Sequence, residues 1–340
     1  MTGHHRAEPT GRRTAPSIEW PTVALIVTCY AAWLAAGLVL YPITPWAALV
    51  TLGLATALHS SLVHECLHGH PTRSSRLNEL LVGLPLGLVY PYRRFKALHL
   101  QHHADERLTD PFEDPESYYR ARWKHDAMPG WLQGLLRLNN TMLGRIVIGP
   151  WLATIGFALS EARLMRSGDA AVRRAWLHHA AGLAIILPIV VWGFGMPLWL
   201  YVLAPVWLGQ AIIAVRTFAE HQWAERPDGR TIIVERSPLA LFFLNNNLHL
   251  VHHKLPTVPW YRLPAIFRER RAEWVGMNGG YVYPNYLALL RAFAFRAKEP
   301  VVHPVLRQMP EPGRAFRPGV RQRNVSGLGS VPVPAEPPTE

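Results

Sequence analysis

The sequence predicts an all-α integral membrane protein with four transmembrane helices, arranged as two hairpins, and a cytoplasmic helical cap. Three observations support this fold class. Four apolar runs contain no charged residue, and they occur as two closely spaced pairs. All of the lysines and arginines fall outside these pairs and their turns. Histidine-rich sequence follows each pair, so we expect the cap to hold the functional residues.

The first pair of apolar runs covers residues 20–41 and 46–63, with a short Pro-containing turn between them. An α-helix rises about 1.5 Å per residue, so about 20 apolar residues cross the hydrocarbon core of a bilayer. Tyr41 and Trp46 border the turn, as aromatic residues do at a membrane–water interface. We therefore expect one transmembrane hairpin here.

The second pair repeats this plan over residues 176–192 and 198–215. The turn between the two runs is rich in Gly and Pro, and Trp192 and Trp199 border it. A soluble protein with buried helices is the alternative, but uncharged runs of this length rarely fit a soluble core.

The distribution of basic residues predicts the topology. Of the 35 lysines and arginines, three precede the first hairpin, 15 lie between the hairpins and 17 follow the second. Loops rich in Lys and Arg stay in the cytoplasm, so both termini and the central segment are expected there. The net charge of +12 is then explained by membrane topology, and no nucleic-acid partner is expected. These patterns predict a multi-pass protein of the cytoplasmic membrane.

The remaining segments define the expected domain organisation. Two further apolar pieces, 80–90 and 146–159, are short for spans, and we expect them at the interface or against protein. We predict a basic cytoplasmic tail over residues 1–18, one membrane domain over 19–298, and a Pro-rich disordered tail over 299–340.

Four groups of histidines follow the two returning helices. Spacings of three and four residues place side chains on one face of a helix, so each multiple group can direct imidazoles toward one point. Imidazole is a ligand for Zn, Fe, Cu and Ni. The candidate metal ligands are His64 and His68; His99, His102 and His103; His221; and His249, His252 and His253.

A zinc peptidase is one alternative, because residues 64–68 read H-E-x-x-H. On a helix, this motif binds zinc through its two histidines and uses the glutamate as general base. The extended form of the motif would require Gly at position 71 and His at position 74, where this chain has Pro71 and Ser74. A catalytic zinc needs three protein ligands, which would leave the two H-x-x-H-H groups unexplained.

The three multiple groups together give H-x-x-x-H, H-x-x-H-H and H-x-x-H-H after two hairpins. This arrangement resembles the membrane fatty-acid desaturase superfamily, over about residues 20–275. The flanking stretches HHADERLTDPFEDPE and HHKLPTVPWYRLP are also similar to that superfamily. Similarity to carotenoid ketolases and related hydroxylases extends to both flanks, so these activities stay open as alternatives to fatty-acyl desaturation.

The resemblance implies two Fe ions held by all nine histidines, with O2 as co-substrate and a membrane lipid as substrate. Catalytic residues separate from the metal ligands are not implied. Electrons are expected from a separate ferredoxin, rubredoxin or cytochrome with its reductase. The sequence leaves the substrate, the position of attack and the oligomeric state open.

Four further residues are predicted to support the metal ligands. Ligating imidazoles usually donate their second N–H group to a carboxylate or carbonyl. Glu65 and Glu220 each neighbour a candidate ligand, and His70 and Asn245 lie close to the first and last histidine groups.

The predicted topology is tested with reporter fusions at Thr44, in the first turn, and at Glu340, at the end of the chain. Because the turn is uncharged and the flanking segments are basic, the two fusions should report opposite sides of the membrane. Reports from the same side would rule out the four-helix topology.

Overall fold

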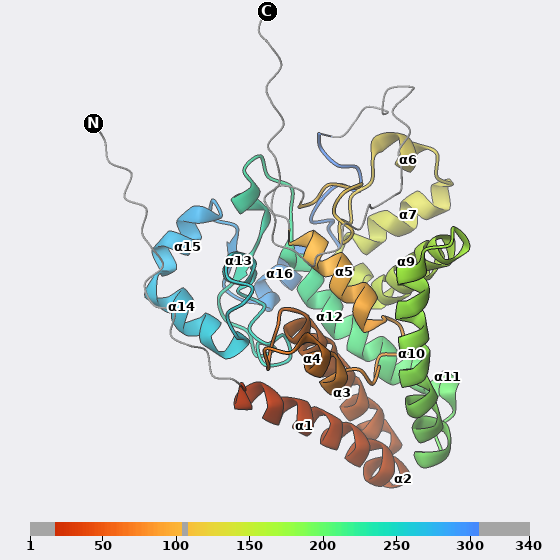
Figure 1. Cartoon of the computed structure of the whole chain (residues 1–340). Coiled ribbons are helices and arrows are strands. Elements are labelled where there is room, and N and C mark those ends of the chain that lie inside the picture. The colour runs from red at the N-terminus through yellow and green to blue at the C-terminus, as the bar shows by residue number, and fades with distance from the viewer. Residues whose placement is uncertain (1–17, 104–107, 306–340) are drawn as a thin grey trace, which may run out of the picture. The chain divides into compact units, whose positions relative to one another are not determined.

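The computed structural model describes residues 18–103 and 108–305, and these ranges are mostly helical (Figure 1). The predicted tail over residues 1–18, apart from Ile18, and most of the predicted tail over 299–340 lie outside the described residues. A small parallel sheet pairs β1 (Ile233–Val234) with β2 (Val282–Tyr283), with Ile233 opposite Val282.

Four helices are long and apolar enough to cross a membrane, as the sequence predicts. They cover Trp20–Ile43, Pro45–Leu67, Ala170–Gly193 and Leu198–Glu220. At about 1.5 Å per residue, helices of 23 or 24 residues are about 35 Å long. Their parts are α1 (Trp20–Ala35), η1 (Ala36–Leu40) and α2 (Tyr41–Ile43); α3 (Pro45–Leu67); α10 (Ala170–Pro188) and η3 (Ile189–Gly193); and α11 (Leu198–Tyr201), η4 (Val202–Val206) and α12 (Trp207–Glu220).

The helices extend beyond the apolar runs at the ends that carry polar residues. α3 continues to Leu67 instead of residue 63, and α12 continues to Glu220 instead of residue 215. The buried polar side chains in these extra turns pack against the rest of the protein, so the helices need not end with the apolar sequence. α10 begins at Ala170 because the Asp169 carboxylate accepts the first free N–H groups of the helix.

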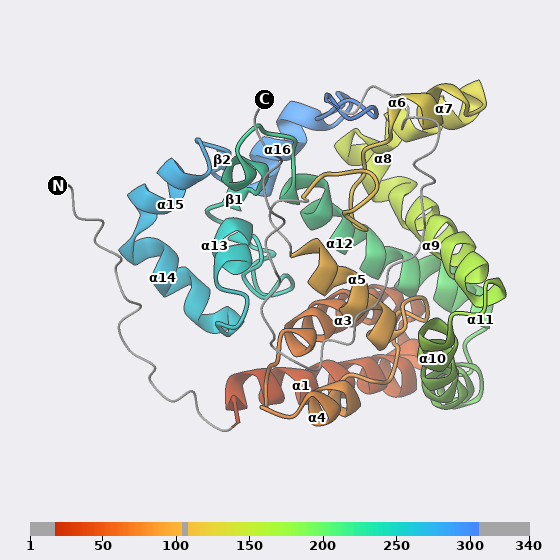
Figure 2. The same ribbon diagram turned by 45° about the horizontal axis from the view of Figure 1, so that its top comes forward.

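α3 is the central helix, and small residues bring it close to α12. A Cβ atom at Gly209 would lie 2.7 Å from Cγ2 of Thr56, and one at Gly53 would lie 2.6 Å from a Leu208 methyl carbon. Only glycine permits this approach, as is common between membrane helices. α3 also contacts α1 and α5, so the polar ends of α3 and α12 lie beside α5 (Figure 2).

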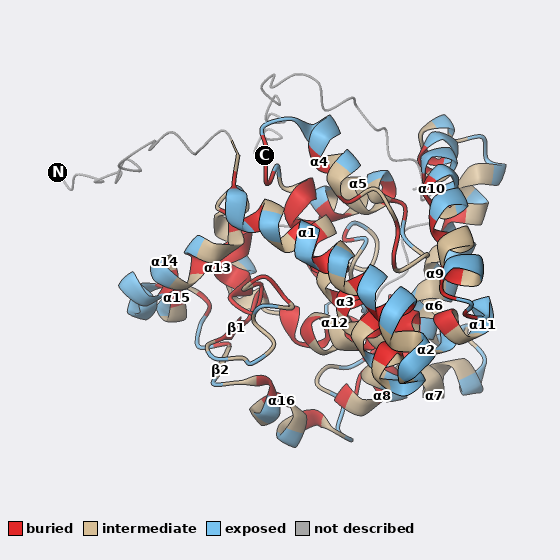
Figure 3. Cartoon of the chain, turned by 90° about the horizontal axis from the view of Figure 1, so that it is seen from below, coloured by how far each residue is buried: buried red, intermediate tan, exposed pale blue. Residues whose placement is uncertain are grey.

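The outward faces of α1 and α10 carry exposed apolar side chains, as expected for surfaces in contact with lipid. Val27 on α1, Val39 on η1, Ile43 on α2, and Leu177 and Ile185 on α10 are all at least half exposed. Figure 3 shows long exposed stretches on both helices.

Shorter helices connect the two pairs of spans. They are α4 (Ser75–Leu81), α5 (Tyr92–His102), α6 (Arg122–Asp126), α7 (Gly130–Asn139), α8 (Met142–Val147) and α9 (Gly149–Arg166). The apolar piece 80–90 forms the end of α4 and irregular chain, whereas the piece 146–159 belongs to α8 and the longer α9. A buried bidentate ion pair between Arg94 and Glu161 joins the start of α5 to α9.

The C-terminal part of the described chain contains the third histidine motif. It contains η5 (Pro227–Arg230), α13 (His249–Lys254), η6 (Trp260–Arg262), α14 (Leu263–Glu269), α15 (Arg271–Met277) and α16 (Tyr286–Phe293). Residues just beyond the predicted domain boundary at 298 also form hydrogen bonds with the rest of the described chain. Val301 O accepts the Arg120 N–H at 2.8 Å, and the Glu299 carboxylate accepts the Tyr119 hydroxyl at 2.6 Å.

Candidate metal centre

The structure brings all nine predicted histidines together, and it divides them into two adjoining groups. Within each group, the potential ligand nitrogens all lie within 4.8 Å of one another. We call them the five-histidine group and the four-histidine group. The first contains His64, His68, His99, His103 and His252, and the second contains His102, His221, His249 and His253.

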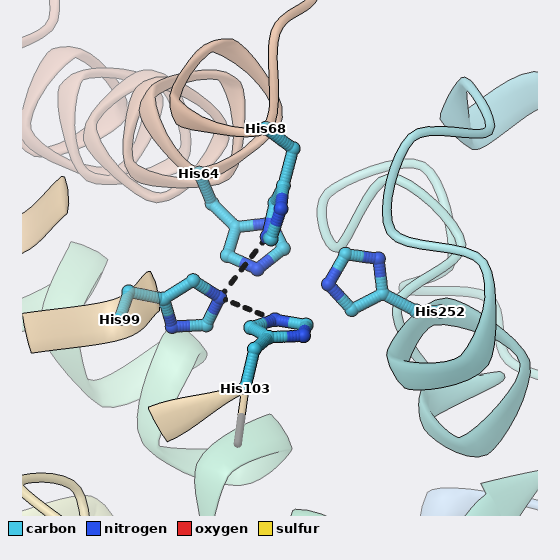
Figure 4. A group of neighbouring side chains, drawn as sticks. All are labelled: His64, His68, His99, His103 and His252. Atoms are coloured by element: carbon cyan, nitrogen blue, oxygen red, sulfur yellow. Dashed lines mark hydrogen bonds between the residues drawn. The ribbon is translucent and has the colours of Figure 1, made fainter. Parts of the chain in front are cut away.

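Helical spacing explains how the histidines divide. Residues four apart project from the same face of a helix, so His64 and His68, and likewise His99 and His103, point into the five-histidine group (Figure 4). The middle residue of each H-x-x-H-H motif points to the other group. The His102 ring therefore lies in the four-histidine group, away from His99 and His103. The His252 ring, from α13, lies in the five-histidine group. The spacing would allow all three imidazoles of an H-x-x-H-H motif to converge on one point, but in the structure the middle one lies in the other group.

The two groups touch each other through consecutive residues. His102 and His103 lie in different groups, as do His252 and His253. The rings of His103 and His253 are stacked with centroids 4.2 Å apart, so they form the boundary between the groups. His221 follows directly after α12 and lies in the four-histidine group, although it belongs to none of the three motifs.

Hydrogen-bond acceptors on the outer side of the histidine rings determine which ring nitrogen carries the proton. The Nδ1 atom of His99 lies 2.8 Å from a Glu116 carboxylate oxygen, and that of His102 lies 2.8 Å from Asp114. The His249 Nδ1 atom lies 2.8 Å from the side-chain oxygen of Asn246. Oxygens of these kinds only accept, so each Nδ1 atom carries a proton and donates it. The Nε2 atoms are then directed at the centre of each group, as in metal-ligating histidines.

These tautomers place two unprotonated nitrogens close together, and a cation would remove the repulsion between them. His221 donates through Nδ1 to the Arg230 carbonyl at 3.3 Å, so His221 and His249 both present unprotonated Nε2 atoms. Those two atoms are only 3.0 Å apart. Burial lowers the pKa of both imidazoles well below the ordinary value, so neither ring supplies a bridging proton. Two lone pairs facing each other at this distance repel unless a positive ion lies between or beside them.

The five-histidine group also contains imidazole nitrogens that lie close together or are buried without a hydrogen-bond partner. Its His99 Nε2 atom lies 2.9 Å from His103 Nε2 and 3.2 Å from His68 Nε2. The Nε2 atoms of His64 and His252 are buried and have no hydrogen-bond partner. Burial, reinforced by the neighbouring imidazoles, lowers the pKa of His68 to about 2, so this ring is neutral. Neutral imidazoles with free lone pairs suit Zn, Fe, Cu or Ni, and both groups are compatible with metal binding.

Carboxylates around the four-histidine group favour positive charge there. Burial disfavours the charged form of His102, but the nearby Glu116, Asp114 and Glu220 together outweigh it and raise the pKa of His102 to about 9. A metal ion at this position would take the place of the proton. The residues present therefore fit a cationic centre in both charge and donor chemistry.

Of the four predicted supporting residues, Glu220 alone lies against a ring of either group. Its carboxylate lies 3.6 Å from His249 Nδ1 and forms an ion pair with Arg216 at 2.7 Å. Asn245 instead donates to the Trp260 carbonyl, and its neighbour Asn246 contacts His249. Asn245 has a positive φ of 56°, which asparagine tolerates well.

Glu65 and His70 form a separate cluster with Glu19. Glu65 accepts the Trp260 backbone N–H at 2.9 Å and lies 3.9 Å from His70 Nε2. A zinc peptidase would need the glutamate of H-E-x-x-H to face a metal-bound water. Glu65 instead contacts the Trp260 backbone and His70, and the two motif histidines belong to a five-histidine group.

Sequence reasoning missed Asp114, Glu116, Asn246 and Lys298. The acidic pair lies in the predicted flank of the second motif, and its role follows from the general need of ligating histidines for outer acceptors. Lys298 is far away in sequence, yet its Nζ atom donates to the His221 carbonyl at 2.6 Å and to the Tyr281 hydroxyl at 2.9 Å. Burial lowers the pKa of Lys298 to about 7.

Comparison with known proteins agrees with this geometry. The family model for fatty acid desaturases matches residues 41–285, which is well over half of the chain and includes every histidine of both groups. The chain belongs to the fatty acid desaturase family.

Curated relatives in this family are distant in sequence. The chain is 24% identical over 279 residues to an omega-6 fatty acid desaturase, chloroplastic, of Spinacia oleracea, covering 75% of this chain and 60% of the relative. It is 27% identical over 291 residues to an sn-1 oleoyl-lipid 12-desaturase of Arthrospira platensis, covering 78% of each. The match thus spans about three fifths of the chloroplastic desaturase and most of the sn-1 oleoyl-lipid enzyme.

Asn246→Ala should weaken the four-histidine group, because His249 would lose the acceptor that fixes its tautomer. Loss of such an outer partner costs about 10- to 100-fold in metal affinity. Asn246→Asp keeps an acceptor and should retain affinity. Measuring bound iron against a graded chelator in purified protein tests this.

Asn245→Gly is the positional control, since glycine accepts the positive φ and only the bond to Trp260 is lost. Its iron retention should match that of the unmodified chain. If Asn246→Ala retains iron as well as Asn245→Gly does, Asn246 has no role in holding the His249 ring.

Proposed function

We propose that the chain is a membrane-bound, di-iron fatty-acyl desaturase that uses O2. The observation that supports this most strongly is the division of nine histidines into two adjoining groups with converging Nε2 atoms. Membership of the desaturase family supports the same reaction class. One metal would need at most one of these groups, so a second group argues for a second ion.

The two histidine groups would hold one iron ion each. When bound, the iron pair would supply the O2-dependent oxidation of an unactivated C–H bond. The protein's own residues fix the imidazoles. Asp114, Glu116 and Asn246 hold three Nδ1 protons in place, and Lys298 anchors the His221 backbone. Burial of the groups excludes water, which protects an oxidising centre from side reactions.

The electrons are proposed to come from a separate protein. Removing two hydrogens from neighbouring methylenes while reducing one O2 to two waters requires two additional electrons and two protons. Within these 340 residues, Cys29 and Cys66 are the only cysteines, which is too few for an iron–sulfur cluster. The excess of basic residues suits an acidic electron carrier, such as a ferredoxin, a rubredoxin or a cytochrome with its reductase.

The proposed location is the cytoplasmic membrane, with both termini and the histidine groups on the cytoplasmic side. The absence of Lys and Arg from both turns supports this orientation. His64 and His221 lie at or just beyond the C-terminal ends of the second and fourth candidate spans. The centre would therefore lie at the membrane surface, where it can reach an acyl chain from the lipid side and an electron carrier from the other.

The proposed substrate is an acyl chain of a membrane lipid. The names of the relatives, an omega-6 fatty acid desaturase and an oleoyl-lipid 12-desaturase, support this class. Oxygenation of a carotenoid or hydroxylation of a lipid is the alternative, since both would start with attack on the same kind of bond.

Lipid and pigment profiling in a host tests the proposal. The host should lack polyunsaturated acyl chains, contain carotenoids, and co-express a ferredoxin and its reductase. Mass spectrometry should detect a new double bond in membrane acyl chains and unchanged carotenoids. A hydroxylated or ketonic lipid or pigment without a new double bond would contradict desaturation.

Matched histidine variants belong in the same experiment. His102→Ala removes a ring of the four-histidine group and should reduce product by at least about 100-fold, since the loss of a direct ligand exceeds that of an outer partner. His178→Ala alters an exposed histidine outside both groups and should leave the product unchanged.

A further inference from the structure

α9 and α10 meet at a corner that carries four exposed arginines. The two helices pack against each other, and only residues 167–169 separate them in the sequence (Figure 2). Two of the arginines lie in the last turn of α9 and two lie near the start of α10. We call these four exposed residues, Arg163, Arg166, Arg173 and Arg174, the arginine corner.

The exposed face of α9 changes from apolar to basic along the helix. Ile155, Leu159 and Arg166 follow one another at intervals of four and seven residues, which place side chains on one face of a helix. Ile155 and Leu159 are 56% and 58% exposed. The apolar part of this face therefore leads directly to the arginine corner.

α10 shows the same change in the opposite direction along the chain. Arg174 comes first, and Leu177 and Ile185 follow three and eleven residues later on the same exposed side of the helix. α10 belongs to a candidate membrane span, so its exposed apolar side chains are expected to contact lipid. Because α9 packs against α10 and is also apolar on its exposed face, we expect α9 to contact lipid too. The arginine corner would then lie at the level of the lipid headgroups.

Nearby carboxylates do not offset the positive charge of the arginine corner. Glu161 and Asp169 are the only acidic residues between positions 159 and 180 of the sequence. Glu161 pairs with Arg94 and accepts the indole N–H of Trp176 at 3.0 Å, while Asp169 accepts the first free N–H groups of α10. Within residues 18–103 and 108–305, none of the four arginines forms an ion pair.

Two of the arginines are directed at the protein and two are open to an external partner. Arg163 and Arg173 donate hydrogen bonds to backbone carbonyls of α9. Arg166 and Arg174 form no hydrogen bond with any described residue. Burial lowers the pKa of Lys124 on α6, and nearby arginines, Arg163 among them, lower it further. Positive charge thus accumulates beside an apolar surface.

We propose that the arginine corner binds the headgroups of anionic phospholipids. A phosphate diester accepts two parallel N–H bonds from a guanidinium group, which favours arginine over lysine at such a site. A lipid with a net negative charge would offset the charge that the protein leaves uncompensated, and its acyl chains would cover the apolar faces of α9 and α10.

The general distribution of basic residues does not account for this arrangement. The positive-inside rule requires only that lysines and arginines lie on one side of the membrane. It does not require four arginines without ion pairs at the ends of two exposed apolar helix faces. Like charges three residues apart, as at Arg163 and Arg166, also weaken a helix unless an anion lies beside them.

The bound lipid would fix α9 at the membrane surface and support α5 through it. Glu161 on α9 pairs with Arg94 at the start of α5, and α5 ends in the second histidine motif. The proposed role is therefore structural. Lipid binding of this kind requires neither bound iron nor the proposed oxidation, so it can be tested without either.

Native mass spectrometry of the full-length chain tests the proposal. The protein in detergent is incubated with equal amounts of dioleoylphosphatidylglycerol and dioleoylphosphatidylcholine, and the retained lipids are counted. The unmodified chain should retain phosphatidylglycerol in preference to phosphatidylcholine. The double variant Arg166→Gln/Arg174→Gln should reduce this preference about 10-fold or more at low salt, because each arginine near a charged headgroup strengthens binding several-fold. An unchanged preference would overturn the proposal.

The double variant Arg226→Gln/Arg268→Gln is the charge-matched control. Both residues are exposed and lie in the C-terminal part of the chain, so the lipid preference should stay as in the unmodified chain. An equal loss in this control would show that net charge alone, and no particular site, selects the lipid. An acidic electron carrier is the competing partner. If Arg166→Gln/Arg174→Gln keeps its lipid preference but binds an acidic ferredoxin more weakly, the corner is a protein-docking surface and the proposal fails.

Spin labels test the expected position of α9 in a bilayer that contains phosphatidylglycerol. The two native cysteines are buried, so labels attach at Ile155→Cys or at Arg166→Cys. The label at position 155 should collide more often with O2, which concentrates in the apolar core, and the label at position 166 with a water-soluble nickel chelate. If position 155 is as accessible to the nickel chelate as an aqueous control label at Arg268→Cys, α9 does not contact lipid and the proposal is overturned.

Discussion

Neutral imidazoles with their lone pairs facing one another are the constraint on which the arrangement of this protein depends. His221 and His249 approach to 3.0 Å between nitrogens that carry no proton, because the opposite nitrogen of each ring donates to an oxygen. His99 is held in the same way by Glu116. Buried lone pairs at these distances are stable only beside positive charge. The oxygens around the rings and the helices that carry the rings therefore form one unit whose chemistry is compatible with cation binding.

The candidate membrane-spanning helices and the shorter helices together build this unit. Close contact through Gly53 and Gly209 places the ends of α3 and α12 together, so His64, His68 and His221 start from neighbouring positions. α5, the residue directly after it, and α13 then supply the other six rings. A single i, i+3, i+4 spacing serves both histidine groups, since the outer histidines of each H-x-x-H-H motif face one group and the middle histidine faces the other.

The sequence was sufficient to predict the elements set by local periodicity. The four spans follow from uncharged runs, and the nine histidines follow from helical spacing after the returning helices. The division of each motif depends on where α5 and α13 lie in space, which periodicity does not contain. Asp114 and Glu116 come from irregular chain, and Lys298 lies far from the groups in sequence. Their roles depend on tertiary contacts alone.

The central claim is that two neighbouring ions occupy the two histidine groups, and Mössbauer spectroscopy of the chain loaded with ⁵⁷Fe tests it most directly. The account predicts two irons per chain that are magnetically coupled to each other. It also predicts that His221→Ala, which alters only the four-histidine group, abolishes the coupled signal. Iron that shows no coupling in the unmodified chain, or an unchanged coupled signal in His221→Ala, would contradict the account.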